Sequence, residues 1–373
     1  MTRIRVAVLM GGRSSEHDVS LASARSVIAA LDPARYETVP VTIGRDGRWA
    51  LAPGGTPALG RAPALAADSA AGAAATGSSA APGSSAAPGS AAATLPLGTD
   101  GGALATAGAL SGVDVVFPVL HGPFGEDGTV QGLLELAGLP YVGSGVGASA
   151  VCMDKDFFKK VLRDSGIPVA AHHAIRLGDP VENPFGYPVF VKPARLGSSV
   201  GISKVASEHD LAAAVELAFR HDEKVLVEEF VDGTEVEVGV LGNRVPPPVA
   251  SLPGQIETLG HDWYDYESKY ADGGMELLVP PPDLSQETIE LRQRRAVESF
   301  VASECEGLAR VDFFVRASDG EVVLNELNTM PGFTATSVWA KLFDASGIGY
   351  AEALDRLIAL ALERHARRAN LIF

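Results

Sequence analysis

The sequence predicts three parts: an α/β part with a parallel sheet, followed by two smaller α+β parts. An apolar run at 6–10 is followed by a helical repeat from about Ser20 and by a second strand-like run at 39–43, the order typical of parallel sheets. Beyond about residue 150 the strand-like runs follow one another with fewer helices between them. A chain of 373 residues is also too long for one small core.

The remaining elements follow from hydrophobic spacing and from turn residues. On the first predicted helix the apolar face carries Leu21, Ala24, Ile28 and Leu31. The further predicted strands are 113–120, 188–193, 201–205, 225–230, 235–241, 309–316 and 321–327. The further predicted helices are 129–138, 154–165, 211–220, 286–304 and 350–366. The glycine-rich run 143–147 lacks dinucleotide-binding spacing and is interpreted as a structural turn.

Composition limits the partners and the compartment. The formal net charge of −16 argues against nucleic acid and against an anionic membrane surface. No apolar run reaches the roughly 18 residues of a membrane helix, and the first apolar run is too short for a signal peptide. The two cysteines, Cys152 and Cys305, form neither a disulfide framework nor a zinc-ligand pattern. We therefore expect a cytoplasmic protein with neither kind of partner.

One segment departs from the globular pattern. Between Ser69 and Thr99 the chain is mostly Ala, Gly, Ser and Pro without a charged residue, and a short stretch is nearly repeated. Such a composition buries too little apolar area to offset the entropy of ordering. We interpret residues 53–112 as a mostly disordered insertion in the first part; the alternative is a linker between separate domains.

The strongest chemical signal is a hairpin that gathers acids. With a turn at 318–320, antiparallel pairing places Asp312 opposite Glu326, and two carboxylates facing each other repel. Arg310 and Asn328 lie two residues away on the same face. An Asp, a Glu and an Asn amide offer the oxygen ligands that Mg²⁺ or Mn²⁺ prefers. The alternative is an ordinary solvated hairpin face.

Three further segments are candidates for ligand contacts. A strand delivers Lys192 into a Gly/Ser turn that can cradle phosphate, although a plain hairpin with a flexible tip remains an alternative. The apolar strand 226–231 can offer its edge to adenine, with an acid nearby for the ribose; the alternative is an edge strand with solvated acids. In the loop 121–128, His121 lies where α/β sheets bind ligands, or it has only a structural role.

Taken together, these motifs resemble the D-alanine–D-alanine ligases of the ATP-grasp superfamily. The resemblance covers nearly the whole chain except 53–112. The matching stretches are 11–20, 121–128, 143–145, 153–155, 192–201, 264–270, 310–312 and 325–332. The family implies an ATP-grasp fold, in which an N-terminal parallel α/β domain (1–150) is followed by two α+β domains (151–232 and 233–373) that clasp ATP.

The resemblance also implies roles for residues at the substrate sites. Glu16 holds the ammonium of the first D-alanine, supported by Ser198 and Tyr270, and His121 lies near this substrate. The oxyanion site is formed by the Arg310 side chain and the Gly332 backbone amide. The second substrate's carboxylate is received by Lys269 and Ser337.

The nucleotide and metal sites are implied in the same way. Lys155 and Lys192 contact the ATP phosphates, residues 228–231 receive the adenine, and Glu235 binds the ribose. Two Mg²⁺ ions, for which Mn²⁺ may substitute, are held by Asp312, Glu326 and Asn328. The full set of nucleotide residues is Lys155, Lys192, Ser199, Glu228, Glu229, Phe230, Val231, Glu235, Phe314 and Asn325.

The implied reaction makes D-alanyl-D-alanine for peptidoglycan through an acyl phosphate. Residues 260–274 resemble a lid that excludes water from that intermediate. Two alternatives remain: a ligase that makes the D-lactate ester, and a nucleotide-binding protein without catalysis. The pair Lys269–Tyr270 matches the peptide-forming pattern, and the family also implies a homodimer.

The insertion gives a first prediction. We expect it to loop out of the first domain away from the site, because its composition supports no packed structure. Deletion of residues 62–93 should leave the catalytic rate near that of the intact chain in a phosphate-release assay. A large loss of rate would refute this placement.

Overall fold

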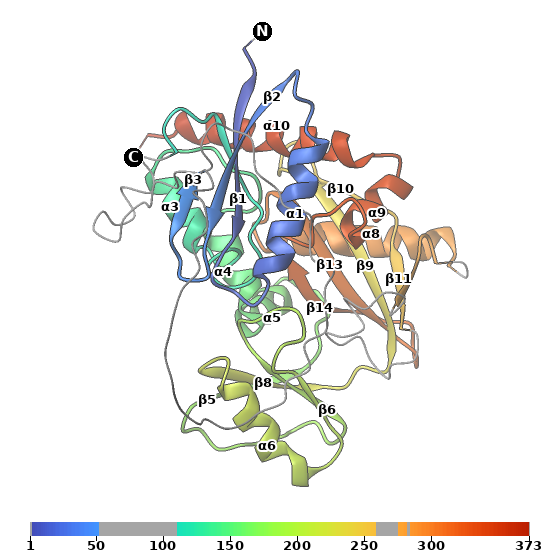
Figure 1. Cartoon of the computed structure of the whole chain (residues 1–373). Coiled ribbons are helices and arrows are strands. Elements are labelled where there is room, and N and C mark those ends of the chain that lie inside the picture. Colours follow the sequence, from blue (N-terminus) through green and yellow to red (C-terminus); the bar gives the residue numbers. More distant parts are fainter. Residues whose placement is uncertain (1, 52–109, 259–274, 282–283, 373) are drawn as a thin grey trace, which may run out of the picture.

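The computed structural model describes residues 2–51, 110–258, 275–281 and 284–372, and these form three sheets with helices around them (Figure 1). The lid predicted at 260–274 and nearly all of the predicted insertion lie outside the described residues, as do Lys269 and Tyr270. In the described part of the chain, no helix is long and apolar enough to cross a membrane.

The first sheet has the predicted parallel arrangement. Its order is β3-β2-β1-β4, and β1 pairs in parallel with both β2 and β4. The short β3 pairs antiparallel with β2 and was not predicted. The bounds are β1 Ile4–Gly11, β2 Tyr36–Ile43, β3 Trp49–Leu51 and β4 Val115–Pro118.

Both faces of this sheet are covered, which explains the unbroken apolar run of β1. Val6 and Val8 share a core with α1 (His17–Ala30) and α10 (Tyr350–Ala369), whereas Ala7 and Leu9 share another core with α3 (Thr129–Leu136). In Figure 1, α10 crosses the molecule beside this sheet. Because the first core also contains Phe333 and Trp339, the first sheet and the C-terminal segment are packed together.

The second sheet belongs to the small lobe at the bottom of Figure 1, where α6 (Glu208–Phe219) packs on one face. Its order is β5-β8-β6-β7, so β8 is an interior strand. The prediction that 226–231 forms an edge strand is therefore wrong, since pairing with the unpredicted β5 covers it. The bounds are β5 His172–Arg176, β6 Val189–Pro193, β7 Ser203–Val205 and β8 Lys224–Glu229.

The third sheet carries the predicted acid hairpin. Valines 236, 238 and 240 of β9 alternate with residues of the opposite face, and Val238 and Val240 pack on α8 (Gln286–Ala302). The order is β12-β11-β9-β13-β14, with β10 pairing to β9. The bounds are β9 Gly233–Gly242, β10 Val249–Ala250, β11 Gly254–Thr258, β12 Met275–Leu278, β13 Gly307–Arg316 and β14 Val322–Asn328.

Three further helices connect the sheets. Asp154 caps α5 (Lys155–Asp164) by accepting hydrogen bonds from the N–H groups of Asp156 and Phe157. Neither α4 (Val146–Met153), which starts within the glycine-rich run, nor α9 (Val338–Ala345) was predicted. The α4 sequence lacks the amphipathic spacing on which the prediction relied, whereas α9 buries Val338, Trp339, Leu342 and Phe343 at helical spacing, a signal that was missed.

A buried ion cluster fixes α5 to the small lobe. The Lys224 ammonium lies 2.6 Å from Asp154 and 3.2 Å from Asp156, and all three residues are buried. Burial alone would raise the pKa of Asp156, but its hydrogen bonds to Lys160 and His172 and the charge of Lys224 outweigh this effect and lower the pKa to about 2. Lys224 is therefore the buried cation that the two acids share.

Substitution Lys224→Met should destabilise the small lobe, because it leaves two buried acids without their buried cation. Breaking a buried pair typically costs about 3–5 kcal/mol, so the denaturant midpoint of this lobe should fall. Lys160→Met, which removes the exposed partner of Asp156, should cost at most about 1 kcal/mol. Equal shifts for the two variants would contradict this account.

Candidate active site

The site is built on a row of three carboxylates. Glu237, Asp312 and Glu326 are direct neighbours on β9, β13 and β14, as the registers of the two strand pairs show. The predicted pairing of Asp312 with Glu326 is confirmed. Asp312 is 1% and Glu237 0% exposed, so the alternative of a solvated hairpin face is wrong.

Two basic side chains offset the repulsion within this row. Arg310 donates two hydrogen bonds to Asp312, of 2.8 and 2.7 Å, and lies 3.0 Å from Glu237. The Lys155 ammonium, from the start of α5, lies 3.4 Å from Glu326 and donates a 2.8 Å hydrogen bond to the Leu196 carbonyl. These cations join α5 and the Gly/Ser turn to the acid row.

The row offers the oxygen chemistry of a magnesium site. Asn328 lies beside it and donates a 3.0 Å hydrogen bond to Asp312. The described residues contain no group of three acidic, histidine or cysteine side chains that could hold a metal alone. Mg²⁺ typically takes one or two carboxylates and completes its shell with water and phosphate oxygens. The donor set therefore fits a divalent ion that arrives with a phosphate-bearing substrate.

A β-bulge next to the row leaves one polar residue outside the ladder. The pairing of β13 with β14 shifts between Asp312 and Phe313, which leaves Asn325 without a partner in the ladder. Its buried side-chain oxygen has no hydrogen-bond partner among the described residues. A buried acceptor of this kind is costly unless a ligand satisfies it.

A second ion cluster lies on the face of the small sheet opposite α6. Glu228 is 2% exposed and pairs with Lys192 and, at 2.8 Å, with the fully buried Lys159. Burial alone would raise the pKa of Glu228, but the charges of the two lysines outweigh this effect and lower it to about 2. Glu228 is therefore ionised and holds the Lys192 ammonium in place.

The Gly/Ser turn contacts the loop between β1 and α1. The Ser198 hydroxyl donates a hydrogen bond to the Glu16 carboxylate, as the resemblance implied. Ser198 and Ser199 have φ angles of +51° and +56°, a strained backbone conformation often found at functional sites. A Cβ at Gly122 would lie 2.8 Å from Glu16, so only glycine lets this carboxylate approach the loop.

His121 and Glu126 join the first domain to the turn after β14. His121 Nδ1 lies 3.0 Å from the Met330 carbonyl, and Glu126 accepts hydrogen bonds from the N–H groups of Gly122 (2.7 Å) and Met330 (3.2 Å). Burial lowers the pKa of His121, although Glu16 opposes the shift. Burial, and then the charge of Glu16, raise the pKa of Glu126 to about 8.

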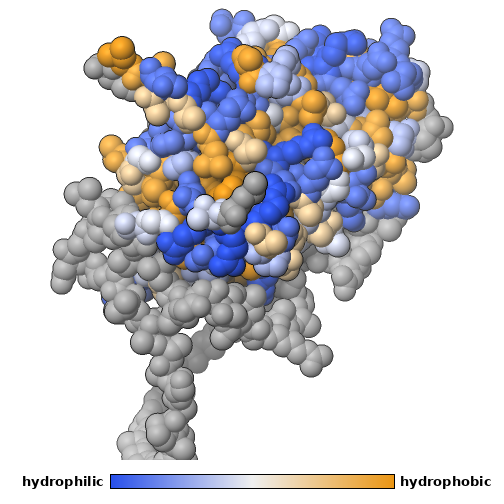
Figure 2. Space-filling view, turned by 90° about the horizontal axis from the view of Figure 1, so that it is seen from above, coloured by the Kyte–Doolittle hydropathy of each residue, from blue (hydrophilic) through white to orange (hydrophobic). Residues whose placement is uncertain are grey.

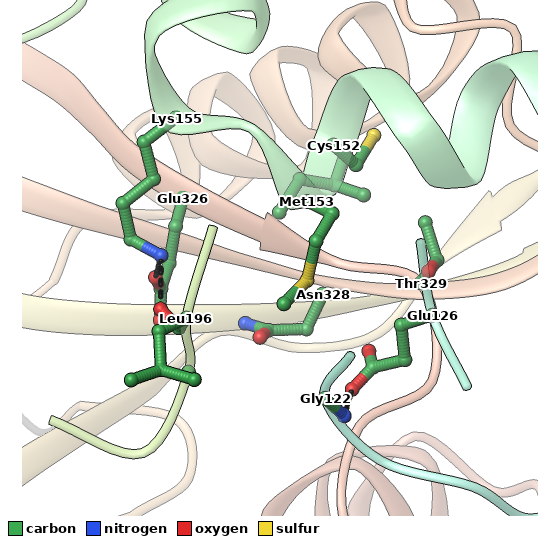
Figure 3. Close-up of a pocket in the computed structure, with 11 residues that line it drawn as sticks. Gly122, Glu126, Cys152, Met153, Lys155, Leu196, Glu326, Asn328 and Thr329 are labelled. Carbon is green, nitrogen blue, oxygen red and sulfur yellow. Dashed lines mark hydrogen bonds and ion pairs between the residues drawn. The ribbon is translucent and has the colours of Figure 1, made fainter. Parts of the chain in front are cut away.

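Several residues of the site line one pocket (Figure 3). Lys155 and Glu326 face each other on one side, Glu126 lies on the other, and Asn328 lies between them. The sequence had placed these elements far apart along the chain, and the structure brings them together. The lining residues are Gly122, Glu126, Cys152, Met153, Lys155, Leu196, Gly197, Glu326, Leu327, Asn328 and Thr329.

The oxyanion and carboxylate candidates are also neighbours. A Cβ at Gly332 would lie 3.2 Å from the Ser337 hydroxyl, and Ser337 is the N-cap of α9. The Ser337 oxygen accepts a 3.1 Å hydrogen bond from Thr334 N–H. Gly332 and Ser337 can therefore face one substrate together, with the positive end of a helix beside it.

The remaining predicted nucleotide residues lie where β8 leads into β9. Glu229 accepts a 2.8 Å hydrogen bond from Ala171 N–H, which ties its side chain to its own lobe. Lys204 lies 4.5 Å from the centre of the Phe230 ring. Val231 packs with Phe314 in a small core, and Glu235 pairs in register with Phe314.

Three residues of the site, Glu237, Lys159 and Glu126, had no role predicted from the sequence. Glu237 is separated from Glu235 by one residue and so shares its face of the strand. Lys159 follows Lys155 by one helical turn, which places both on one side of α5. Glu126 was visible only as one of two acids in a loop. The spacing was a usable signal for the first two, whereas the burial of Glu126 depends on the distant Met330.

The chain matches known proteins along most of its length. Residues 5–144 match the family model for the D-ala D-ala ligase N-terminus, and residues 161–359 match that for the C-terminus. A D-alanine–D-alanine ligase of Corynebacterium efficiens is 46% identical over 97% of both chains.

Solved structures agree with these matches. The VanG D-Ala:D-Ser ligase of Enterococcus faecalis has a TM-score of 0.76 and 32% identity, over 96% of this chain and 100% of that one. The D-alanine–D-alanine ligase of Bacillus anthracis complexed with ATP has a TM-score of 0.72 and 26% identity, over 98% and 99%. The chain, with its mixed α/β sheets in an ATP-grasp arrangement, therefore belongs to the D-alanine–D-alanine ligase family.

Proposed function

We propose that this protein joins two D-alanine molecules at the expense of ATP, through a D-alanyl phosphate, and so supplies D-alanyl-D-alanine for peptidoglycan. The observation that carries the proposal is the acid row Glu237–Asp312–Glu326, which faces a Gly/Ser turn already bonded to Glu16. The acid row suits a metal-bound triphosphate, and Glu16 suits an ammonium group.

The nucleotide would lie between the small sheet and the acid row. Lys155 and Lys192 then bind phosphates, and each is already oriented by one carboxylate, Glu326 or Glu228. The ionised Glu228 can accept a hydrogen bond from an adenine amino group. Residues Glu229, Phe230, Val231 and Phe314 would enclose the base, Glu235 would bind the ribose, and Ser199 and Asn325 would contact the phosphates.

Asp312, Glu326 and Asn328 would hold two Mg²⁺ ions, for which Mn²⁺ could substitute. When bound, such ions would offset the negative charge of the phosphates. The Asp312 carboxylate would then be shared between the metal and Arg310, and Glu237, 3.0 Å from Arg310, would keep the guanidinium beside the site.

The chain's own residues then guide two chemical steps. Glu16 would hold the first D-alanine's ammonium near His121, so that the D-alanine carboxylate can attack the γ-phosphate, form D-alanyl phosphate and release ADP. The second D-alanine, held by Lys269 and Ser337, would attack the acyl carbon of this intermediate with a neutral amine, and inorganic phosphate would leave. Arg310 and the Gly332 N–H stabilise the oxyanion, and one such donor is typically worth about 3–4 kcal/mol. Tyr270 would support Glu16 together with Ser198.

We also propose the three domains 1–150, 151–232 and 233–373, a cytoplasmic location and a homodimer. On the face seen in Figure 2, hydrophobic and hydrophilic residues are interspersed. Around α3 and α4 the apolar side chains Phe124, Leu136 and Val146 are 46%, 90% and 40% exposed. A second copy of the chain would cover them.

The function is tested by incubating the protein with ATP, Mg²⁺ and D-alanine. Phosphate release should depend on D-alanine and match the dipeptide formed, and D-lactate should not replace the second D-alanine. Asp312→Asn should raise the Mg²⁺ concentration required by more than about tenfold, because a carboxylate ligand is lost. Asp319→Asn, at the exposed tip of the same hairpin, is the control. ATP hydrolysis without dipeptide would overturn the proposal.

The raised pKa of Glu126 predicts a pH dependence. Below a pKa of about 8 this carboxyl is neutral, and a neutral acid attracts the first D-alanine's ammonium less than a carboxylate does. D-alanine binding should therefore weaken as the pH falls from about 8.5 to about 6.5, and Glu126→Gln should flatten this dependence. Calorimetric titration across this range measures it. If D-alanine binding by Glu126→Gln depended on pH as steeply as binding by the unsubstituted protein, Glu126 would be excluded as the cause of the pH dependence.

A further inference from the structure

The turn Met330–Phe333, which carries the Gly332 amide between β14 and α9, is held by side chains from distant parts of the chain. Glu126 accepts a hydrogen bond from Met330 N–H, and His121 contacts the Met330 carbonyl. The Ser23 hydroxyl accepts a 3.2 Å hydrogen bond from Phe333 N–H, and Tyr350 donates a 2.8 Å hydrogen bond to the Phe333 carbonyl. The backbone is thus bound on both sides of Gly332.

Burial lowers the pKa of His121, and in the neutral ring its hydrogen bonds have one consistent direction. A carbonyl oxygen only accepts, so Nδ1 carries the hydrogen that binds Met330. The oxygen of Ser23 accepts from Phe333, so its own hydrogen is available for His121 Nε2, 3.2 Å away. In a neutral imidazole with hydrogen on Nδ1, every group in this chain of bonds has a partner of the right kind.

Burial makes this chain of bonds hard to replace. Ser23 is 0% and His121 4% exposed, so water cannot readily take the place of a deleted group. The side chains of the turn are anchored as well. The ring centroids of Phe333 and Phe117 of β4 are 5.6 Å apart, and Met330 packs in the same core. Both ring nitrogens of His121 are thus engaged by protein groups rather than directed at a substrate.

We propose that Ser23 and His121 are positioning residues that set the place of the Gly332 amide and thereby control acyl transfer to the second D-alanine. The inference rests on the proposed function, in which this amide is an oxyanion donor. The donors of such a site act only when well placed, and a misplacement of about 1 Å can cost about 100-fold in rate. Phosphoryl transfer from ATP depends on Lys155, Lys192 and the acid row instead and should be spared.

Rapid-quench kinetics with ATP, Mg²⁺ and D-alanine separate the two steps, since ADP reports acyl phosphate formation and dipeptide reports transfer. In Ser23→Ala, ADP should form in the first turnover at a rate within about twofold of the unsubstituted protein, while dipeptide formation falls about tenfold or more. Ser165→Ala is the control, because the exposed hydroxyl of Ser165, at the end of α5, bonds to the Val161 carbonyl one helical turn earlier. It should change neither rate.

A rescue experiment addresses His121. His121→Asn retains an N–H that can reach the Met330 carbonyl, so it should transfer the acyl group faster than His121→Ala. If His121→Ala does not fold, Ser23→Ala decides alone. Equal losses of ADP and dipeptide formation in Ser23→Ala, or no loss of either, would overturn the inference. Absence of dipeptide from the unsubstituted protein would instead refute the proposed function.

Discussion

The arrangement of the site depends on repulsion among three carboxylates that the sheet holds side by side. Glu237, Asp312 and Glu326 cannot move apart, because they lie in register on adjacent strands. Their negative charges are offset by two cations: Arg310, on β13 of the same sheet, pairs with Glu237 and Asp312, and Lys155, on α5, pairs with Glu326. Such a row destabilises the fold unless cations pair with it. The ion pair of Lys155 with Glu326 and its hydrogen bond to Leu196 therefore hold α5 and the Gly/Ser turn against this face of the sheet.

The same logic explains how a chain of net charge −16 can bind a polyanion. In the described part of the chain, the cations that would meet ATP are each fixed by an acid: Lys155 by Glu326 and Lys192 by Glu228. Fixed partners keep these ammonium groups oriented before the nucleotide arrives, which lowers the entropy cost of binding. Lys159 adds a buried charge that keeps Glu228 ionised.

The parts of the site that could be predicted are those set by local geometry. The hairpin predicted around 318–320 placed Asp312 opposite Glu326, and this pair is confirmed. Between this pair and the turn, an unpredicted bulge shifts the register by one residue, so the turn alone does not set the pairing of the acids. The interior position of β8 could not be predicted, because it depends on pairing with β5, some fifty residues earlier. The burial of Glu126 likewise arises only when its loop meets a turn about two hundred residues away.

These long-range contacts explain why the two substrate sites cannot be treated as separate modules. The loop 121–128, which contacts Glu16 through Gly122, also contains His121 and Glu126, and both of these side chains bind the backbone of Met330, two residues before Gly332. The core beneath them is shared between the first sheet and the C-terminal segment, so the two cannot shift independently without breaking close packing. The N-terminal sheet would thus both hold the first amino acid and fix the amide that would stabilise the oxyanion during its transfer.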